Sequence, residues 1–367
     1  MATTTTTAPP TRPAAPSVNA LTTGRLPKYS PLAILLGSWV VMLVVFGLLA
    51  AAGVTEGFGW TTAIVLGTVL YAVLVFVVSY MVEGVRRAKD RIVTTLVSAA
   101  FVIALVPLIS VLVTVVTSGA ARFDGDFFSM SMRNVVGAGG GGLHALTGTL
   151  LITALATVIS VPIGLLTAIY LVEYGRGRLA RAITFFVDVM TGIPSIVAGL
   201  FAYALFVIFF GEGVRMGAAG SVALAVLMIP VVVRSTEEML KLVPNELREA
   251  SFALGVPKWL TVLKVVLPTS IAGIVTGVML SIARVIGETA PLLITAGFTA
   301  SMNYDLFDGR MQSLPVFAYS SYVSQGTDAA AYIDRAWTSA LTLILIVMAL
   351  NLVARLIARL FAPKLGR

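Results

Sequence analysis

Two charged residues inside an apolar segment, Arg284 and Glu288, have the clearest chemical potential in the sequence. They lie four residues apart, so on one helix their side chains share a face and can pair. A charge at the centre of a bilayer costs at least about 2.5 to 3.5 kcal/mol, so this face is expected to meet protein or water. A guanidinium stays charged at physiological pH and offers a planar fork of donors to an oxyanion. The pattern therefore predicts an anion contact at Arg284, held in place by Glu288.

The same predicted face carries small residues. At about 100° per residue, all of its members fall within an arc of roughly 80°. Besides the two charges, the face contains Gly273, Gly277, Ser281 and Pro291. Small residues at i, i+4 and i+8 allow a second helix to approach closely. We expect Gly273, Gly277 and Ser281 to form a helix-packing face.

A second polar face is predicted in the apolar segment 182–210, within an arc of about 60°. It consists of Asp188, Gly192, Ser195 and Gly199. Pro194 is available to kink this helix. We therefore expect Asp188 to line a polar path through the apolar region.

Arg234, at the inner end of the next apolar segment, has two interpretations. It could contact an anion at the exit side, or it could be an ordinary basic anchor at the membrane surface. For Asp188, Arg284 and Glu288 the alternative is a buried structural ion-pair network between packed helices.

The segment between Arg234 and Pro268 is too ordered to be a simple connector. Pro244 and Asn245 are a helix-start signal, and residues 246–254 favour a short helix. Gly255 can cap that helix, and Pro257 prevents its continuation. The segment predicts a helix, a sharp turn and a second helix at the membrane surface, a shape suited to docking on a partner.

Several kinds of site are absent from the sequence. The glycines at 137, 139 and 142 satisfy GxGxxG, but no strand precedes them, and a flexible loop is the better interpretation. No Gly-Lys dipeptide occurs, so the P-loop of ATPases is missing. There is no cysteine and a single histidine, His144, which we expect to be a polar interfacial residue because a soft metal site needs further ligands. With no nucleophile and base together, an enzyme is improbable.

The composition is that of a polytopic helical membrane protein. Of the 367 residues 58% are hydrophobic and 11% charged, with a mean hydropathy of +0.98. Apolar runs of about 20 residues can each cross a bilayer as a helix. Eight are expected, at 32–53, 60–82, 93–117, 145–171, 182–210, 218–234, 269–297 and 337–361. Residues 1–30, rich in Thr, Pro and Ala, predict a disordered tail, and 362–367 a second short tail.

The basic residues fix an expected orientation. Of the 25 lysines and arginines, 19 lie in segments on one side of the predicted spans and five on the other. The positive-inside rule then places both termini in the cytoplasm. Their grouping in short clusters argues against a nucleic-acid surface.

The inner loop resembles the EAA-xxx-G-(nine)-IxLP loop of bacterial ABC import permeases. The matching residues are Glu249, Ala250, Ser251, Gly255, Val265, Leu267 and Pro268, with Ser251 replacing an Ala and Val265 an Ile. In that family the loop forms a coupling helix in a groove of the ATPase subunit. The resemblance therefore implies that Glu249, Ala250, Ser251 and Gly255 couple this chain to an ATPase.

Further segments are similar to the A-type permease family (PstA) of bacterial high-affinity phosphate transporters. They are YLVEYGRGRLAR (170–181), IPSIVAGLFAY (193–203), TEEMLKLVPNELREASFALGVPKW (236–259) and SIARVIGETAPLL (281–293). This similarity covers about residues 90–361. It implies a six-helix ABC type I importer permease domain at 91–361, with the coupling loop at 235–268. Residues 31–90 would be two extra N-terminal helices.

The resemblance also implies the transport complex to which this chain would belong. It would be a phosphate importer working by alternating access in the bacterial inner membrane. A C-type permease, two copies of an ATP-binding subunit and an extracytoplasmic phosphate-binding protein would be its partners, with ATP and magnesium used by the ATPase and no cofactor in this chain. Arg284, Glu288 and Arg234 would be translocation residues. The alternatives are a permease for another oxyanion and, in a different class, an ion-coupled secondary carrier.

Overall fold

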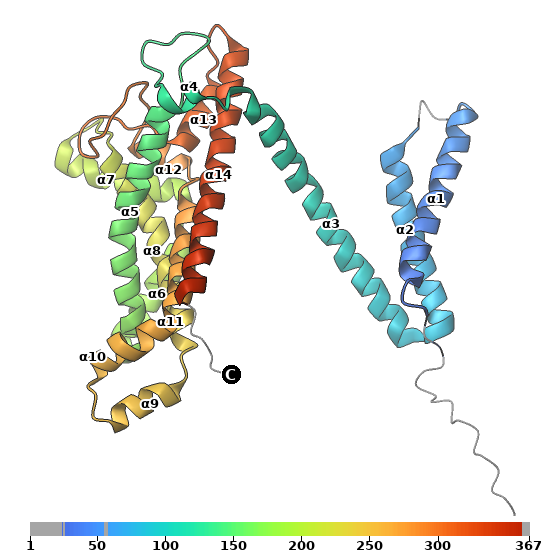
Figure 1. The fold of residues 1–367 in the computed structure, drawn as a ribbon, viewed down its shortest axis with the longest axis horizontal. Helices are drawn as coiled ribbons and strands as arrows, with labels where there is room; N and C mark the ends of the chain where they lie inside the picture. The colour runs from blue at the N-terminus through green and yellow to red at the C-terminus, as the bar shows by residue number, and fades with distance from the viewer. Residues whose placement is uncertain (1–23, 25, 55–57, 362–367) are drawn as a thin grey trace, which may run out of the picture. The chain divides into compact units, whose positions relative to one another are not determined.

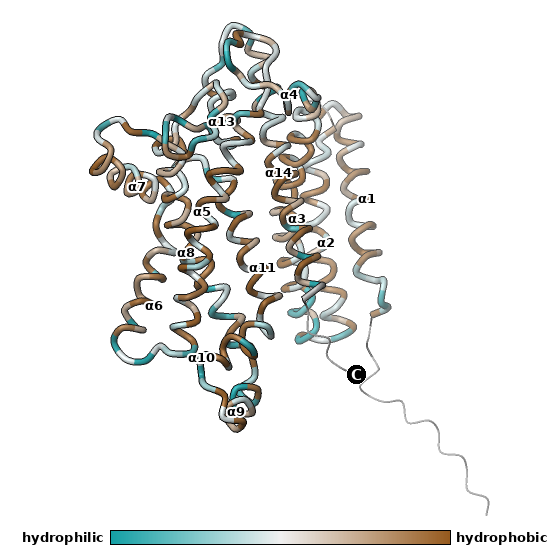
Figure 2. Tube along the Cα trace, turned by 60° about the vertical axis from the view of Figure 1, so that its left-hand side comes forward, coloured by the Kyte–Doolittle hydropathy of each residue, from teal (hydrophilic) through white to brown (hydrophobic). Residues whose placement is uncertain are grey.

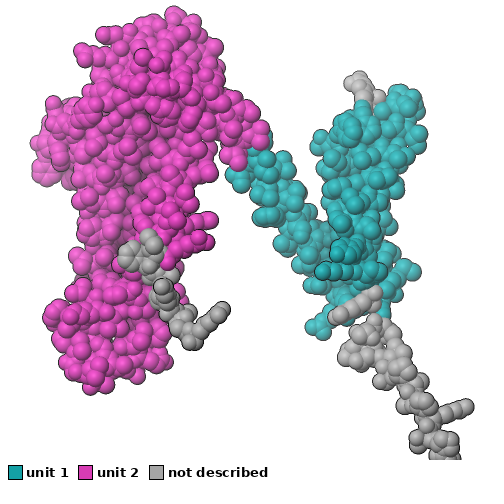
Figure 3. All heavy atoms as spheres, in the orientation of Figure 1, with its two compact units in different colours: residues 1–110 teal, residues 111–367 magenta. Residues whose placement is uncertain are grey.

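The structure is a computed structural model that describes residues 24, 26–54 and 58–361. In this part of the chain every regular element is helical, which confirms the predicted all-α fold. The chain divides into two compact units, residues 1–110 and 111–367, and each is considered by itself (Figure 3). The predicted tails lie outside the described residues, except for Gly24 and residues 26–30.

Two helices of the first unit, α1 (Ser30–Ala51) and α2 (Trp60–Glu83), pack side by side (Figure 1). Gly67 permits this close approach, because a Cβ there would lie 2.7 Å from Cδ1 of Trp39. Trp39 Nε1 donates to Thr68 Oγ1 at 3.1 Å. Both helices leave most of their apolar side chains exposed, as expected of segments that face lipid.

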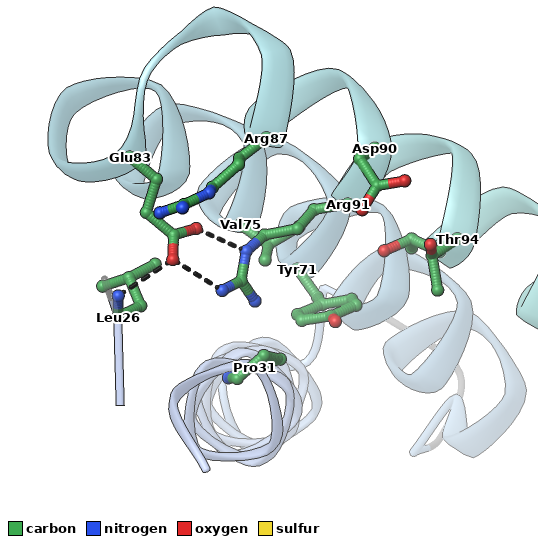
Figure 4. A pocket seen from close by; sticks show the side chains of 10 residues that line it. Leu26, Pro31, Tyr71, Val75, Glu83, Arg87, Asp90, Arg91 and Thr94 are labelled. Carbon is green, nitrogen blue, oxygen red and sulfur yellow. Dashed lines mark hydrogen bonds and ion pairs between the residues drawn. The ribbon is translucent and has the colours of Figure 1, made fainter. Parts of the chain in front are cut away.

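A charged cluster joins the end of α2 to the start of α3 (Val85–Gly119). The Glu83 carboxylate accepts hydrogen bonds from Arg91 Nε at 2.7 Å and from Arg91 Nη2 at 3.0 Å (Figure 4). The Leu26 N–H donates to the same carboxylate at 2.9 Å. Glu83 and Arg91 line a cavity of about 540 Å³ together with Arg87 and Asp90. The two acids and two bases of this cavity cancel in formal charge.

The second unit holds the remaining helices. After the end of α3 they are α4 (Gly125–Ser129), α5 (Leu143–Ile169), α6 (Gly177–Thr191), α7 (Ser195–Phe210), α8 (Gly217–Lys241), α9 (Asn245–Ala253), α10 (Lys258–Thr261), α11 (Leu267–Val285), α12 (Ala290–Thr295), α13 (Leu314–Val323) and α14 (Ala329–Phe361). Figure 1 places α9 and α10 at one end of this unit and α4 and α13 at the other, here called the α9 end and the α13 end.

Helix α8 is the centre of the second unit, packed against α5, α7 and α11. Its small and apolar residues are mostly buried, and Leu224, Met228 and Val232 belong to the main core. Gly164 of α5 allows close contact, since a Cβ there would lie 2.7 Å from Cγ1 of Val232. Figure 2 shows these helices mostly brown along their length, with much of the teal in the loops at the two ends.

The predicted spans are largely confirmed. Seven helical segments are long and apolar enough to cross a membrane, and they match seven of the eight predicted ranges. The eighth, 182–210, is sharply broken: α6 and α7 meet at a bend of 111°, more than the kink expected at Pro194, and the bent pair counts as an eighth span only if both halves are taken together. Gly192 ends α6 and Pro194 precedes α7, so the two halves point in different directions and the predicted single face is not formed.

Two other boundaries differ from the prediction. Helix α11 ends at Val285, and residues 286–289 form a turn before α12, so the segment 269–297 is not one helix. The long loop 298–336 contains α13 and the first turns of α14. The helix, turn and helix of the inner loop are confirmed as α9, a turn at Gly255 and α10.

Candidate functional site

Arg284 and Glu288 do not form the predicted ion pair. Arg284 lies in the last turn of α11 and is exposed, whereas Glu288 lies in the turn beyond it, where its N–H donates to Val285 O at 3.1 Å. Because the helix has ended, the i,i+4 geometry that would bring the side chains together is lost. Neither side chain has an ion-pair partner among the described residues. The Arg284 guanidinium is therefore free to take an external anion.

Asp188 pairs instead with Arg234, across α6 and α8. Arg234 Nη2 donates to Asp188 Oδ1, and its Nη1 donates to Glu237 Oε2 at 2.9 Å. Lys241 Nζ donates to the other Glu237 oxygen at 2.6 Å. Two bases and two acids thus form one network. Glu237 was not predicted as a site residue, although the spacings i,i+3 and i,i+4 from Arg234 to Glu237 to Lys241 carried the signal.

The two arginines occupy different levels of the second unit. The packing of α11 on α8 sets Gly277 beside Ser235, because a Cβ on Gly277 would lie 2.6 Å from the Ser235 Cβ. Arg284 is seven residues further along α11, or about 10 Å at 1.5 Å per residue. Arg284 therefore lies nearer the α13 end and Arg234 nearer the α9 end, which sets two cationic groups at successive depths.

The residues predicted as a packing face lie along the contact between α11 and α8. A Cβ on Gly273 would lie 2.7 Å from Cγ of Met239, so a larger residue there would require the Met239 side chain to shift. Ser281 is fully buried and donates from Oγ to Val278 O at 2.6 Å. The small residues allow α11 to lie directly on the helix that carries Arg234.

Helix α9, the turn after it and α10 together form residues 245–261, here called the α9 segment, which lies at the α9 end (Figure 1). Glu249 and Ala250 are exposed, whereas Ser251 is buried and shares a hydrogen bond of 2.8 Å with Thr261 Oγ1. Gly255 has φ +77°, a left-handed conformation that suits glycine. Exposed apolar side chains surround this turn, and they are Leu242, Leu247, Phe252, Leu254 and Trp259. Together they form an exposed apolar surface at the α9 end.

Arg248 fastens α9 to the end of α5, a contact that the sequence analysis missed. Its Nη1 donates to Val243 O at 2.6 Å, and its Nη2 donates to Leu240 O at 2.9 Å. It also bonds Glu173, in the π-helical turn Tyr170–Tyr174 that follows α5. Lys258 Nζ donates to the Glu173 carbonyl and lies over the Tyr174 ring. The α9 segment is thus tied to a membrane helix.

His144 and the glycine-rich loop have structural surroundings. His144 lies in the first turn of α5, where the loop meets the helix as predicted, but it is 2% exposed and contacts the Phe317 ring edge to face, so its side chain is buried within the protein. The carbonyls of Gly137 and Gly139 accept hydrogen bonds from Arg335 Nη1. A nucleotide cradle would need free backbone N–H groups, whereas here carbonyls bind a cation. The described residues contain no cluster of His, Cys, Asp and Glu that could hold a metal.

Comparison with known proteins identifies the family. Residues 160–367 match the family model of the binding-protein-dependent transport system inner membrane component. This chain belongs to that family. The permease is 48% identical over 275 residues to "Phosphate transport system permease protein PstA 1" of Mycobacterium tuberculosis (strain ATCC 25618 / H37Rv), covering 74% of this chain and 88% of that protein.

Two further relatives agree. The protein named "Phosphate transport system permease protein PstA" of Mycobacterium leprae (strain TN) is 48% identical over 272 residues, covering 73% of this permease and 88% of the relative. The protein of the same name from Yersinia pestis is 40% identical over 280 residues, covering 76% of this permease and 92% of the relative. The permease therefore spans most of the length of each relative.

Proposed function

We propose that this permease imports inorganic phosphate across the bacterial cytoplasmic membrane by alternating access, driven by ATP hydrolysis on a separate chain. The assignment of phosphate as the substrate rests on one observation: this chain is 48% identical to relatives named as phosphate permeases, over 88% of the length of those relatives. A free arginine within a membrane-spanning bundle suits such a substrate, because a guanidinium binds phosphate oxygens with two parallel hydrogen bonds.

In this proposal Arg284 is the first anion contact in the bundle and Arg234 the second. An anion can bind Arg284 without displacing another residue, whereas the Arg234 guanidinium is already bound to Asp188 and Glu237. An arriving phosphate would compete with these carboxylates for the guanidinium. Glu288, in the turn that follows α11, makes no ion pair with Arg284 in this structure and would act only by repelling an anion that arrives at that turn. A site that binds too tightly would not release its substrate.

The proposed coupling runs through α9. Glu249, Ala250, Ser251 and Gly255 would form the surface that sits on an ATP-binding subunit, with ATP and magnesium bound in that subunit. The partners are a C-type permease, two copies of the ATP-binding subunit and an extracytoplasmic phosphate-binding protein. The α9 end and both termini would then face the cytoplasm, in agreement with the positive-inside rule.

The domain organisation proposed with this function separates residues 91–361, the permease domain with its coupling loop at 235–268, from two extra helices in 31–90. Curated relatives cover about three quarters of this chain, which leaves room for such an addition.

Uptake of radiolabelled phosphate tests the function. A host lacking its own phosphate permease should regain uptake when this chain is expressed with its three partners, and unlabelled phosphate should compete while sulfate should not. Competition by sulfate and not by phosphate would identify a permease for another oxyanion. Uptake that needs this chain but no ATP-binding subunit would identify an ion-coupled carrier.

A further inference from the structure

A cavity of about 680 Å³ opens in the second unit towards the α13 end. Its polar lining comes from one guanidinium, one amide and several hydroxyls. The residues are Arg215, Thr299, Gln312, Tyr319, Ser320, Ser321, Ser324 and Tyr332. No aspartate or glutamate lines it, in contrast to the charge-balanced cavity at Glu83. A cavity with one sign of charge concentrates ions of the opposite sign.

Arg215 is the charged group of this cavity, and it is unpaired. No carboxylate lies within ion-pair distance of it among the described side chains. Two acids of the adjoining loops make local hydrogen bonds instead: Asp305 accepts from the Phe307 N–H and Asp328 from the Ala331 N–H, at 2.8 and 3.2 Å. Arg215 therefore carries a positive charge that no carboxylate of the described residues pairs with.

A second arginine is fixed beside the first. The Met216 N–H donates to Thr295 O, and the Met311 N–H donates to Ala296 O, both at 3.1 Å. These two bonds hold the residues that precede them, Arg215 and Arg310, on either side of the end of α12.

Both side chains then run over the same glycine. A Cβ on Gly297 would lie 3.1 Å from Cδ of Arg215 and 3.6 Å from Cδ of Arg310. Gly297 has φ +74°, a conformation that disfavours a larger residue. Because Gly297 has no side chain, the aliphatic parts of both arginine side chains can lie close together there.

The cavity is connected to Arg284 by a single short helix. Leu293 and Ile294 of α12 line the cavity, and α12 begins two residues after Glu288. Six helical residues span about 9 Å. An anion held at the cavity would therefore be about one short helix away from the turn that follows Arg284.

We propose that this cavity is a receiving site for an oxyanion, in which Arg215 binds the anion directly and Arg310 attracts it from the rim. The inference rests on the proposed function, in which the oxyanion is inorganic phosphate released on the extracytoplasmic side. The hydroxyls of Ser320, Ser321 and Ser324 supply donors for further phosphate oxygens. The site adds one step to the proposed path, because the anion would meet Arg215 before it reaches Arg284.

The test measures phosphate binding by the purified complete transporter, without the binding protein, by equilibrium binding of radiolabelled phosphate. Arg215→Gln should weaken binding roughly tenfold or more, as expected for loss of a charge-assisted hydrogen bond. Arg215→Lys should lose less, because it keeps the charge without the fork. Arg310→Gln should show a smaller loss than Arg215→Gln.

The matched control is Arg133→Gln, which removes an exposed arginine that does not line the cavity. It should bind phosphate as the unaltered protein does. Each variant is normalised to the amount of assembled complex, and Arg215→Lys serves if Arg215→Gln fails to assemble.

Two results would overturn the inference while the proposed function stands. One is ATP-driven phosphate uptake by the unaltered complex together with unchanged phosphate binding in both Arg215 variants. The other is an Arg215→Gln complex that needs more binding protein for half-maximal uptake but binds phosphate normally, which would assign the arginine to docking of that protein. If the unaltered complex transports no phosphate, the proposed function fails and this inference fails with it.

Discussion

Arg248 donates two hydrogen bonds to a single carboxylate oxygen of Glu173, from Nε at 3.0 Å and from Nη2 at 2.9 Å. The residues are 75 positions apart, and their side chains are 13% and 6% exposed. The pair joins α9, the proposed docking helix, to the turn that ends α5. In the proposed coupling, this buried, charge-assisted contact would transmit a movement of α9 to a membrane helix.

Breaking this pair should uncouple the transporter. In Arg248→Met the Glu173 carboxylate is left buried without its cation, a change that costs up to about 3 to 5 kcal/mol in other proteins. We expect less assembled complex and, per assembled complex, a steep fall in phosphate uptake at a given rate of ATP hydrolysis. Arg178→Met, at an exposed arginine of α6, is the control and should leave the ratio unchanged. Normal uptake per ATP in Arg248→Met would show that the pair does not couple.

Arg284 can be tested by a contrast of substitutions. Arg284→Lys keeps the charge but loses the planar fork, and Arg284→Gln loses the charge. Both should assemble normally while uptake falls, with Gln the worse. Because the structure shows no Arg284 to Glu288 pair, adding Glu288→Gln should not restore uptake to Arg284→Gln. Near-normal uptake in that double variant, normalised to assembled complex, would leave a structural ion pair as the role of Arg284.

Gly255 tests the docking turn. Its φ of +77° strains any β-branched residue, so Gly255→Val should distort the turn between α9 and α10. ATP hydrolysis by the complex should then lose its dependence on the binding protein. Gly177 has φ +78° and equally open surroundings, so Gly177→Val applies the same strain away from the turn. If both variants keep hydrolysis dependent on the binding protein, the turn is not the docking element.

The extra N-terminal helices can be removed. A chain in which Met1 is followed directly by Glu83 keeps both partners of the Glu83 to Arg91 bond and the basic flank of α3. We expect uptake per assembled complex to equal that of the full chain, with lower abundance. Full abundance with no uptake would instead include α1 and α2 in the transport path.

The sequence predicted those features that depend on local signals. The helix from Asn245, its end at Gly255 and the restart after Pro257 follow from capping preferences that need no tertiary contact. The apolar runs predicted the spans because bilayer thickness sets their length. The spacing of Arg234, Glu237 and Lys241 also carried a signal, which a search for i,i+3 and i,i+4 pairs would have found.

Features that depend on tertiary structure were not predicted. The break at Gly192 to Pro194 lies in a continuous apolar run, and composition does not distinguish a kink from a bend of 111°. The end of α11 at Val285 separated Arg284 from Glu288 although their spacing favoured a pair. The partners Glu173 and Arg248 are brought together only by the packing around α8, and no local pattern links them.

ATP-dependent phosphate uptake into proteoliposomes tests the central claim most directly. The complex of this permease with its three partners would be reconstituted, with ATP and magnesium supplied on the side that carries the ATP-binding subunits. We predict that radiolabelled phosphate accumulates only with hydrolysable ATP and binding protein, that sulfate does not compete, and that Arg284→Gln abolishes most of the accumulation. Accumulation without ATP, or none with it in the fully assembled complex, would contradict the assignment.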